Sequence, residues 1–257
     1  MDVRGDIVEL FSGIQGEGPR VGERHIFLRL ARCNLDCAYC DQPESRTAPR
    51  HVLIETKPGG RRFVRVANPV SSHALAGILR RFNTPPIHRV LSVTGGEPLM
   101  QADFLAALLP AVRANELRVL LETNGMLHDP LRALLPHIDI VSMDFKLRSA
   151  TGRPTPWKAH RLFLHAAVRG RKETYVKAVV SDRTTPREVM EAARLIAGIG
   201  GGVPLVLQPL TPRHGKRSGD APRAPEPNRL LALQAAALRV IDDVRVIPQT
   251  HKMLRQR

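Results

Sequence analysis

Short apolar runs alternate with longer amphipathic segments along most of the chain, a pattern typical of a parallel α/β fold. Runs of strand length lie at residues 25–31, 89–93, 117–122, 138–143, 174–180 and 203–207. Helical periodicity follows at residues 71–82, 102–115, 154–169, 186–199 and 228–240. With right-handed crossovers, six parallel strands would form an incomplete β/α barrel or an open doubly wound sheet. In both architectures the chemistry belongs at the carboxyl ends of the strands.

The length of 257 residues and a hydrophobic content of 43% fit a single domain over residues 1–257. Two segments interrupt the alternation. Residues 43–70 form a basic insertion with a short hairpin expected around Pro58-Gly59-Gly60, and residues 213–227 are typical of a flexible loop. No apolar stretch approaches the roughly 20 residues of a membrane span, and the first residues do not resemble a secretory signal. We therefore expect a cytoplasmic enzyme without membrane contact.

The chain is strongly basic, with 39 Lys and Arg against 24 Asp and Glu and a formal charge of +15. Such a field attracts anions. The basic residues are dispersed, however, and aromatic residues make up only 4% of the chain, which is a poor platform for stacked bases. Anionic small ligands are therefore favoured over nucleic acid, which is not expected as a partner.

All three cysteines, Cys33, Cys37 and Cys40, lie within eight residues. Structural zinc and ordinary electron-transfer clusters take four protein ligands, whereas three cysteines on a 4Fe-4S cluster leave one iron open. Three is an odd number for a disulfide framework. A zinc site completed by a histidine such as His25 remains an alternative. The spacing therefore favours a metal centre that something other than protein completes.

Polar residues gather where successive predicted strands end. The second strand ends in Thr94-Gly-Gly-Glu-Pro98, the third in Glu122-Thr-Asn-Gly125 and the fourth in Ser142-Met-Asp-Phe-Lys146. Paired glycines allow a backbone to approach a ligand closely. Polar groups at several neighbouring strand ends predict one shared binding site.

These motifs resemble those of the radical S-adenosylmethionine (radical SAM) superfamily. Cys33-x3-Cys37-x2-Cys40, with Tyr39 before the last cysteine, is similar to its cluster motif, and residues 94–98 are similar to its methionine-binding motif. The resemblance implies a partial β/α barrel, a 4Fe-4S cluster on the three cysteines, and S-adenosylmethionine on the fourth iron. It also implies a 5′-deoxyadenosyl radical that abstracts hydrogen from a substrate.

Within the superfamily the chain looks like a member of the 7-carboxy-7-deazaguanine synthase family. The resemblance implies a lyase that converts 6-carboxy-5,6,7,8-tetrahydropterin to 7-carboxy-7-deazaguanine with ring contraction and loss of ammonia, on the route to queuosine and archaeosine. It further implies a homodimer and an electron donor such as flavodoxin or ferredoxin. The segments that carry it are residues 11–19, 27–35, 40–41, 122–125, 142–146, 177–182, 207–209 and 247–252.

The same resemblance assigns binding residues, and no catalytic side chain is expected beyond the cluster and S-adenosylmethionine. Arg29 is the expected partner of the pterin carboxylate, because a guanidinium can hold a carboxylate in bidentate fashion. Cofactor binding is implied for Tyr39, Asp41, Gly95, Gly96, Glu97, Glu122, Asn124, Ser142, Asp144, Lys146, Lys177 and Gln208. Substrate binding is implied for Ile14, Gln15, Gly16, Glu17, Arg29, Thr94, Pro248 and Gln249.

One position departs from the family pattern. The family usually has a Mg²⁺-binding threonine after Cys-Asp, and this chain has Gln42. An amide oxygen is an acceptable Mg²⁺ ligand, so Gln42 is a candidate, although its longer side chain shifts the ion or leaves it to other ligands.

Two other classes of function stay open. The first is a radical SAM activating enzyme that acts on a glycyl radical site of a protein. The second is an iron-sulfur or zinc protein that binds tRNA through its basic surface.

Overall fold

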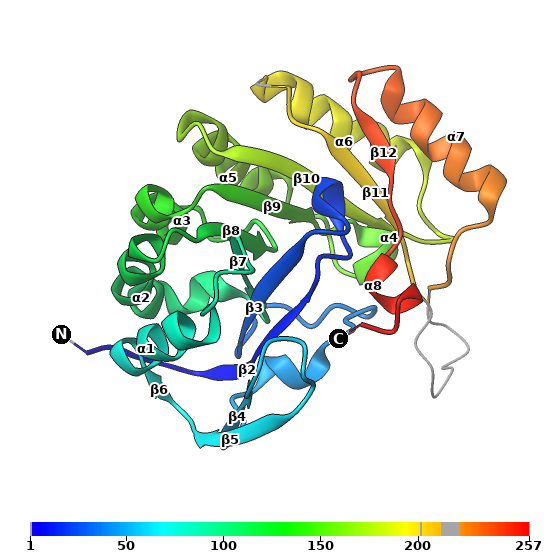
Figure 1. The fold of residues 1–257 in the computed structure, drawn as a ribbon. Coiled ribbons are helices and arrows are strands. Elements are labelled where there is room, and N and C mark those ends of the chain that lie inside the picture. Colours follow the sequence, from blue (N-terminus) through cyan, green and yellow to red (C-terminus); the bar gives the residue numbers. More distant parts are fainter. Residues whose placement is uncertain (1, 201, 212–221, 257) are drawn as a thin grey trace.

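A curved, mainly parallel sheet organises the protein, whose computed structural model describes residues 2–200, 202–211 and 222–256 (Figure 1). The ten strands of the main sheet in this described part follow the order β12-β11-β10-β9-β8-β7-β3-β2-β4-β5. The first seven in this order are mutually parallel. They are β3 (Arg24–Leu30), β7 (Val90–Gly95), β8 (Arg118–Thr123), β9 (Ile140–Phe145), β10 (Glu173–Val180), β11 (Leu205–Pro209) and β12 (Val244–Val246).

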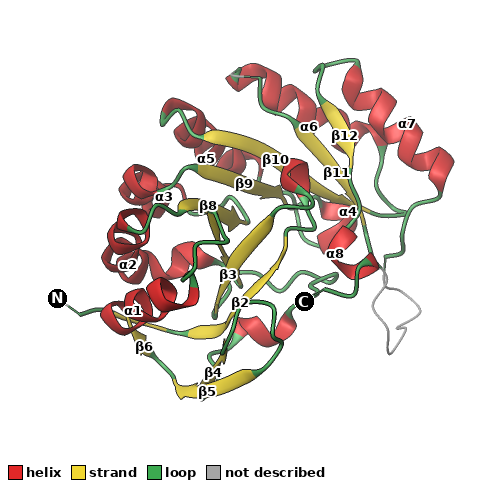
Figure 2. Ribbon diagram, in the orientation of Figure 1, coloured by secondary structure: helices red, strands yellow, loops and turns green. Residues whose placement is uncertain are grey.

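The six predicted parallel strands are confirmed, and β12 is an additional one. The sheet order is open, because β12 and β5 are its two edges, so the barrel is incomplete. Helices surround the outside of the sheet in Figure 2. They include α1 (Ser72–Phe82), α2 (Ala102–Ala114), α3 (His128–Leu134), α5 (Trp157–Arg169), α6 (Pro186–Ile199) and α7 (Pro227–Leu238).

The predicted helices are confirmed within a few residues of their ends. The helix α6 begins as its sequence predicts. Thr185 and Glu188 form a reciprocal capping box and Pro186 occupies the first turn. Short helical segments complete the described part: α4 (Arg148–Thr151), α8 (Thr250–Met253), η1 (Gly18–Arg20), η2 (Pro43–Arg46), η3 (Pro98–Gln101) and η4 (Leu135–His137).

The basic insertion is built into the sheet. β4 (His51–Glu55) and β5 (Phe63–Ala67) form an antiparallel hairpin, which confirms the turn expected around Pro58-Gly59-Gly60. β4 pairs in parallel with β2 (Ile7–Ile14), a strand that the apolar pattern did not identify, and β2 runs antiparallel to β3. A separate two-stranded sheet joins β1 (Arg4–Gly5) to β6 (Val70–Ser71).

The second interrupting segment is only partly visible in the structure. Residues 213–221 of the predicted loop lie outside the described residues. Residues 222–226 form neither helix nor strand, and α7 begins at Pro227. Among the helices of the described part, none is both long enough and apolar enough to cross a bilayer.

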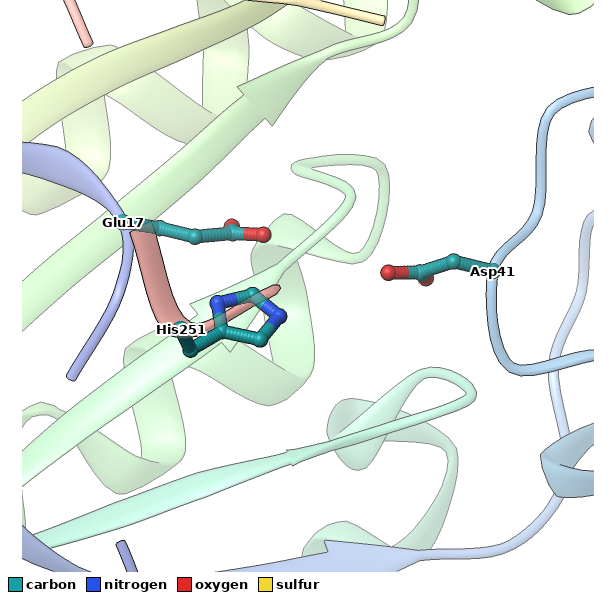
Figure 3. Close-up of side chains that lie close together, drawn as sticks. All are labelled: Glu17, Asp41 and His251. Carbon is teal, nitrogen blue, oxygen red and sulfur yellow. The ribbon is translucent and has the colours of Figure 1, made fainter. Parts of the chain in front are cut away.

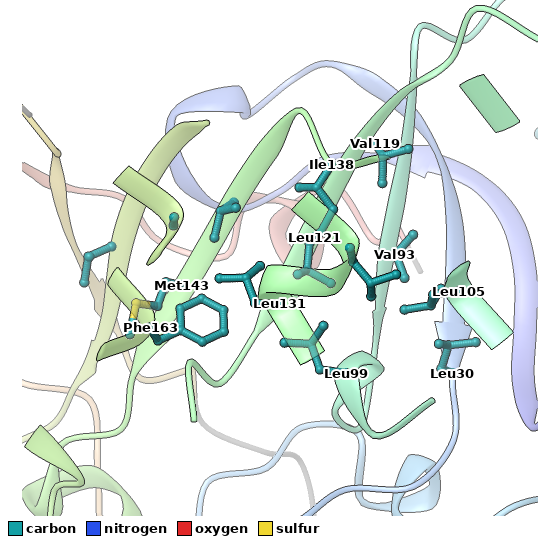
Figure 4. Close-up of a cluster of buried hydrophobic side chains, with 14 of the residues drawn as sticks. Leu30, Val93, Leu99, Leu105, Val119, Leu121, Leu131, Ile138, Met143 and Phe163 are labelled. Atoms are coloured by element: carbon teal, nitrogen blue, oxygen red, sulfur yellow. The ribbon is translucent and has the colours of Figure 1, made fainter. Parts of the chain in front are cut away.

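Strand residues alternate between the helix layer and the barrel interior, and this alternation positions the site. The outward side chains, such as Val93, Leu121 and Met143, pack against the helices in the main hydrophobic core (Figure 4). The inward side chains at the amino end form a small apolar cluster of Val90, Leu120, Ile140, Tyr175 and Val206. The inward side chains nearer the carboxyl end are mostly polar. The barrel interior is therefore apolar at the amino ends of the strands and polar at their carboxyl ends, and we call this second part the polar upper chamber.

Candidate functional site

The polar upper chamber is a pocket that collects nearly every residue predicted from the sequence. Of the 24 predicted site residues, only Glu97 and Pro248 do not line it. The lining residues among the predictions are Ile14, Gln15, Gly16, Glu17, Arg29, Cys33, Cys37, Tyr39, Cys40, Asp41, Gln42, Thr94, Gly95, Gly96, Glu122, Asn124, Ser142, Asp144, Lys146, Lys177, Gln208 and Gln249.

The three cysteines lie as free thiols on the loop that follows β3, with Cys37 buried and the other two half-buried. Burial raises the pKa of the Cys33 and Cys37 thiols, so a bound metal is needed to favour their thiolates. Ligand atoms of one zinc ion lie within about 4.6 Å of each other, twice the Zn–S distance of about 2.3 Å. Among the described residues, the cysteine sulfurs do not form a group within 4.8 Å. Three thiols on one loop are one fewer than a closed zinc site needs, so the donor set fits a 4Fe-4S cluster with one open iron.

His25 does not complete a zinc site with these cysteines. It lies at the opposite end of β3, fully buried, where its Nδ1 contacts Ser92 Oγ at 2.8 Å and its Nε2 contacts Glu23 Oε2 at 3.1 Å. The zinc alternative based on His25 is therefore wrong.

The paired glycines bring the end of β7 against the backbone that leads to the cysteine loop. Gly95 has φ +136°, and a Cβ atom there would lie 2.0 Å from the Leu30 carbonyl oxygen. A Cβ atom on Gly96 would lie 2.0 Å from the Arg32 carbonyl oxygen. Only glycine therefore allows this close approach of two strand ends.

Glu97 forms its hydrogen bonds with other groups of the protein. It is fully buried, and its carboxylate accepts hydrogen bonds from Thr123 Oγ1 and Asn124 N, both at 2.8 Å, and from Leu99 N at 3.1 Å. The carboxylate therefore fixes the neighbouring strand end and does not face the pocket. Pro248 is exposed to solvent outside the pocket. Neither residue lines the pocket, and the ligand contacts of both stay predictions.

A chain of hydrogen bonds and ion pairs links charged and polar side chains across the pocket. Lys177 Nζ pairs with Glu17, which also accepts a hydrogen bond from Gln249 Nε2 at 2.6 Å. Gln249 Nε2 also donates to Asp41 at 3.1 Å, and Lys252 Nζ lies 3.2 Å from the same carboxylate. Burial opposes ionisation of Asp41, but Lys252 and Gln249 outweigh it and lower its pKa to about 2. Both carboxylates are therefore ionised and held in place.

Figure 3 shows the Glu17 and Asp41 carboxylates facing each other, with the His251 ring beside the gap. One ligand atom from each lies within 4.8 Å of the other two, a spacing that a metal ion could use. Lys177 and Lys252 already neutralise the two carboxylates. A divalent cation at this point would therefore compete with two ammonium groups.

A second group of charges lies next to the cysteine loop. Lys146 Nζ donates to Asp144 Oδ2 at 2.9 Å and to Tyr39 Oη at 3.0 Å. Burial disfavours the charged lysine, but Asp144 and Tyr39 raise the pKa of Lys146 well above its ordinary value. Asp144 Oδ1 and Gln208 Oε1 are buried acceptors without a hydrogen-bond partner among the described residues. Such atoms are positioned to accept hydrogen bonds from a polar ligand.

Glu122 and Arg29 both line the pocket, and each is held by other side chains of the protein. Glu122 accepts hydrogen bonds from Gln15 Nε2 and Thr94 Oγ1, each at 2.9 Å. Arg29 Nε donates to Glu9 Oε1 at 2.8 Å, and both side chains are largely buried. The charge of Arg29 is therefore already balanced by a carboxylate.

The segment before β3 and the segment before α8 meet at Gly16. Thr250 N donates to the Gly16 carbonyl oxygen at 2.9 Å. A Cβ atom on Gly16 would lie 2.2 Å from His251 Nδ1, so this position has no space for a side chain. The residues around Gly16 and Gln249 therefore form one wall of the pocket although 233 positions separate them.

Sequence analysis missed His160, which supports two strand-end loops from outside the pocket. Its Nε2 accepts a hydrogen bond from Lys146 N at 3.0 Å, and its Nδ1 lies 3.2 Å from the Gly125 carbonyl oxygen. The ring also stacks on Phe145, with centroids 4.8 Å apart. These contacts need a neutral imidazole, and burial lowers its pKa to about 4. A lone histidine within an amphipathic helix carries no signal of this role.

We expect the stability of the protein to fall as the pH decreases from about 6.5 to 4. Over this range the unfolded chain protonates His160 while the folded protein does not, so protonation favours unfolding. The loss from this residue amounts to about 3 kcal/mol. Denaturant unfolding at several pH values should show a shallower pH dependence for H160Q than for the wild type. The exposed H51Q variant should retain the wild-type slope, and an unchanged slope in H160Q would contradict the assignment.

The pocket has further lining residues that the sequence did not single out. Lys252 belongs to the segment 247–252, whose pattern predicts no separate role for it, and Arg46 lies in the basic insertion. The full set is Phe27, Leu35, Ser45, Arg46, Thr123, Val179, Leu210, Thr211, His251 and Lys252.

Comparisons with known proteins agree with this geometry. Residues 29–207 match the family model described as the radical SAM superfamily. A 7-carboxy-7-deazaguanine synthase from Geobacter sulfurreducens is 40% identical over 253 residues, covering 98% of this chain and 97% of the relative. One from Methanothermobacter thermautotrophicus is 35% identical and covers 98% of both chains. The crystal structure of QueE from Escherichia coli has a TM-score of 0.60 at 19% identity, covering 96% of this chain and 94% of that chain.

Proposed function

Because the chain belongs to the radical SAM superfamily and, within it, to the 7-carboxy-7-deazaguanine synthase family, we propose that its pocket converts 6-carboxy-5,6,7,8-tetrahydropterin to 7-carboxy-7-deazaguanine. The net change is a ring contraction with loss of one ammonia. One observation carries the proposal. Three free cysteines share a loop at the pocket, beside a strand end whose close backbone approach only glycines permit.

The residues fit the two cofactors of the superfamily. Cys33, Cys37 and Cys40 would hold a 4Fe-4S cluster and leave one iron open. The backbone at Gly95 and Gly96 would receive the methionyl end of S-adenosylmethionine. When bound, the pair supplies a one-electron cleavage of the sulfonium that gives methionine and a 5′-deoxyadenosyl radical.

The protein's own part is to orient these ligands. The buried acceptors Asp144 Oδ1 and Gln208 Oε1 suit hydroxyl or amino donors, such as those of a ribose or a pterin ring. Lys146 fixes Tyr39 beside the cysteine loop through its hydrogen bond. Each of these groups is already ordered by a protein partner, so little reorganisation is needed when a ligand binds.

The segment before β3 and the segment before α8 supply groups for the substrate. Gln15, Glu17 and Gln249 present amide and carboxylate groups, which match the donor and acceptor edge of a pyrimidine ring. Lys177 lowers the pKa of Glu17 despite its burial, so Glu17 acts as an acceptor. We assign these three residues to recognition of the ring.

Magnesium remains part of the proposal through Gln42, which lines the pocket. Its amide oxygen is the candidate ligand. The neighbouring carboxylates of Glu17 and Asp41 are already paired with Lys177 and Lys252, so neither is a free charged ligand for the ion. A flavodoxin or ferredoxin as electron donor, a homodimeric state and a cytoplasmic location also belong to the proposal.

The two other classes of function have weaker support. An enzyme that activates a glycyl radical site must admit a protein segment. In this structure, α8 and Gln249 close one side of the pocket. A tRNA-binding protein would need no such polar chamber. Relatives over nearly the whole chain share the synthase name, which favours the small substrate.

The decisive experiment incubates anaerobically reduced enzyme with S-adenosylmethionine and 6-carboxy-5,6,7,8-tetrahydropterin. We expect 7-carboxy-7-deazaguanine and ammonia in equal amounts. Iron analysis should give about four irons per chain. A protein with a complete cluster that cleaves S-adenosylmethionine but forms no 7-carboxy-7-deazaguanine would reject the substrate assignment. Stoichiometric zinc without visible absorption would reject the radical chemistry.

A further inference from the structure

The positive charges that line the pocket are not equally balanced. Five lysine and arginine side chains line it, and four of them pair with a carboxylate. The pairs are Arg29 with Glu9, Lys146 with Asp144, Lys177 with Glu17, and Lys252 with Asp41. Arg46 is the fifth, and no ion pair of Arg46 occurs between the residues that the structure describes.

Arg46 is nevertheless held in a defined position. It is the last residue of η2, directly after the cysteine loop, and its Nη2 donates to the Cys37 carbonyl oxygen at 3.0 Å. Its Nε is buried and has no hydrogen-bond partner within the described ranges. The nearby Asp36 is exposed and bound to Arg153 at 2.6 Å. A buried donor without an acceptor is unfavourable, so this nitrogen is suited to an acceptor that a ligand brings.

We propose that Arg46 binds a ligand carboxylate in this pocket. The inference rests on the proposed function, which brings two carboxylates here, one on S-adenosylmethionine and one on the pterin. A guanidinium forms strong, directional hydrogen bonds with a carboxylate. Arg29, expected from the sequence to fill this role, already uses its Nε on Glu9. Arg46, whose charge has no carboxylate partner among the described residues, is therefore a carboxylate partner in addition to Arg29.

The test compares ligands that differ only in the carboxylate. Cluster-loaded, unreduced enzyme is titrated with S-adenosylmethionine and its decarboxylated form, and with 6-carboxytetrahydropterin and tetrahydropterin. We expect R46Q to raise the Kd of at least one carboxylated ligand about 10- to 100-fold, and to leave its carboxyl-free partner unchanged. The affected pair identifies the source of the carboxylate. R46K, which keeps the charge but loses the planar fork, should weaken the same ligand by about 3- to 10-fold.

Controls separate binding from damage to the cysteine loop. The iron content and cluster absorbance of R46Q should match those of the wild type. If R46Q loads less iron, the ligand affinities of R46K test the proposal instead. The exposed R50Q variant, four positions away, should bind all four ligands normally. Unchanged affinity for both carboxylated ligands, or equal weakening of the carboxyl-free ones, would overturn the proposal. A wild-type protein that binds neither pterin would count against the proposed function, and the S-adenosylmethionine pair would still decide Arg46.

Discussion

Replacing Cys37 with serine will reduce iron loading and abolish both cleavage of S-adenosylmethionine and product formation. Cys37 is the most buried of the three cysteines and lies between the other two in the loop. A serine hydroxyl is a poor ligand for iron in a cluster that thiolates normally hold. With two cysteines left, the cluster loses the three-point attachment that its open iron requires. Of all the changes considered, this one should have the largest effect on activity.

The measurements are iron and sulfide per chain, visible absorbance, 5′-deoxyadenosine and 7-carboxy-7-deazaguanine, all under anaerobic conditions. The matched control is A38S, because Ala38 is the next residue of the same loop and is exposed. A38S should load iron and turn over like the wild type. A C37S protein that kept four irons and formed 5′-deoxyadenosine at the wild-type rate would show that the triad is not the cluster site.

Replacing Glu17 with glutamine will lower the free energy of unfolding by about 3 kcal/mol and will remove activity. The change leaves the Lys177 ammonium buried, with Asp144 Oδ2 at 3.7 Å as its remaining carboxylate contact. Both side chains of the pair are mostly shielded, at 11% and 16% exposure, which supports a substantial penalty at the lower end of the range for buried pairs. Activity should fall because Glu17 also holds Gln249 in place.

A double variant distinguishes two effects of E17Q, the loss of stability from an unpaired Lys177 and the loss of activity from the missing Glu17 carboxylate. E17Q/K177M removes both charges, so it should recover most of the lost stability while remaining inactive. Denaturant unfolding of the cluster-loaded proteins measures the first effect, and product formation measures the second. E44Q, at an exposed glutamate, should change neither. Equal stability of E17Q and the wild type would indicate that the pair is solvated in solution.

Strands and helices could be predicted wherever the pattern of apolar and polar residues continued over enough positions to show its period. Six strands and five helices follow from periodicity, because burial on one face imposes it over six or more residues. The strand β12 was missed because it has three residues, with Arg245 at its centre and two aspartates before it. The strand β2 was missed because Glu9, Ser12 and Gly13 interrupt its apolar residues, so neither a continuous run nor a regular alternation stands out.

The site residues were predictable where they belong to short sequence motifs. The cysteine triad and the strand ends of β7, β8 and β9 are each a motif of a few consecutive positions, and all four motifs contribute to the pocket. The pairings between these segments were not predictable. Glu17 and Lys177 are 160 positions apart, and only the fold brings them together. The pairing of Arg29 with Glu9, which leaves Arg46 as the one lining cation without a carboxylate partner among the described residues, likewise depends on the register of two strands.

The wall formed by Gly16 and Thr250 also has a consequence for synthesis on the ribosome. The hydrogen bond between them joins residues 234 positions apart, so nearly the whole barrel must be translated before this wall can close. A nascent chain that lacks Gln249 and Lys252 lacks two side chains of this wall. The wall is therefore completed only after residues 249–252 have been translated and have packed against Gly16.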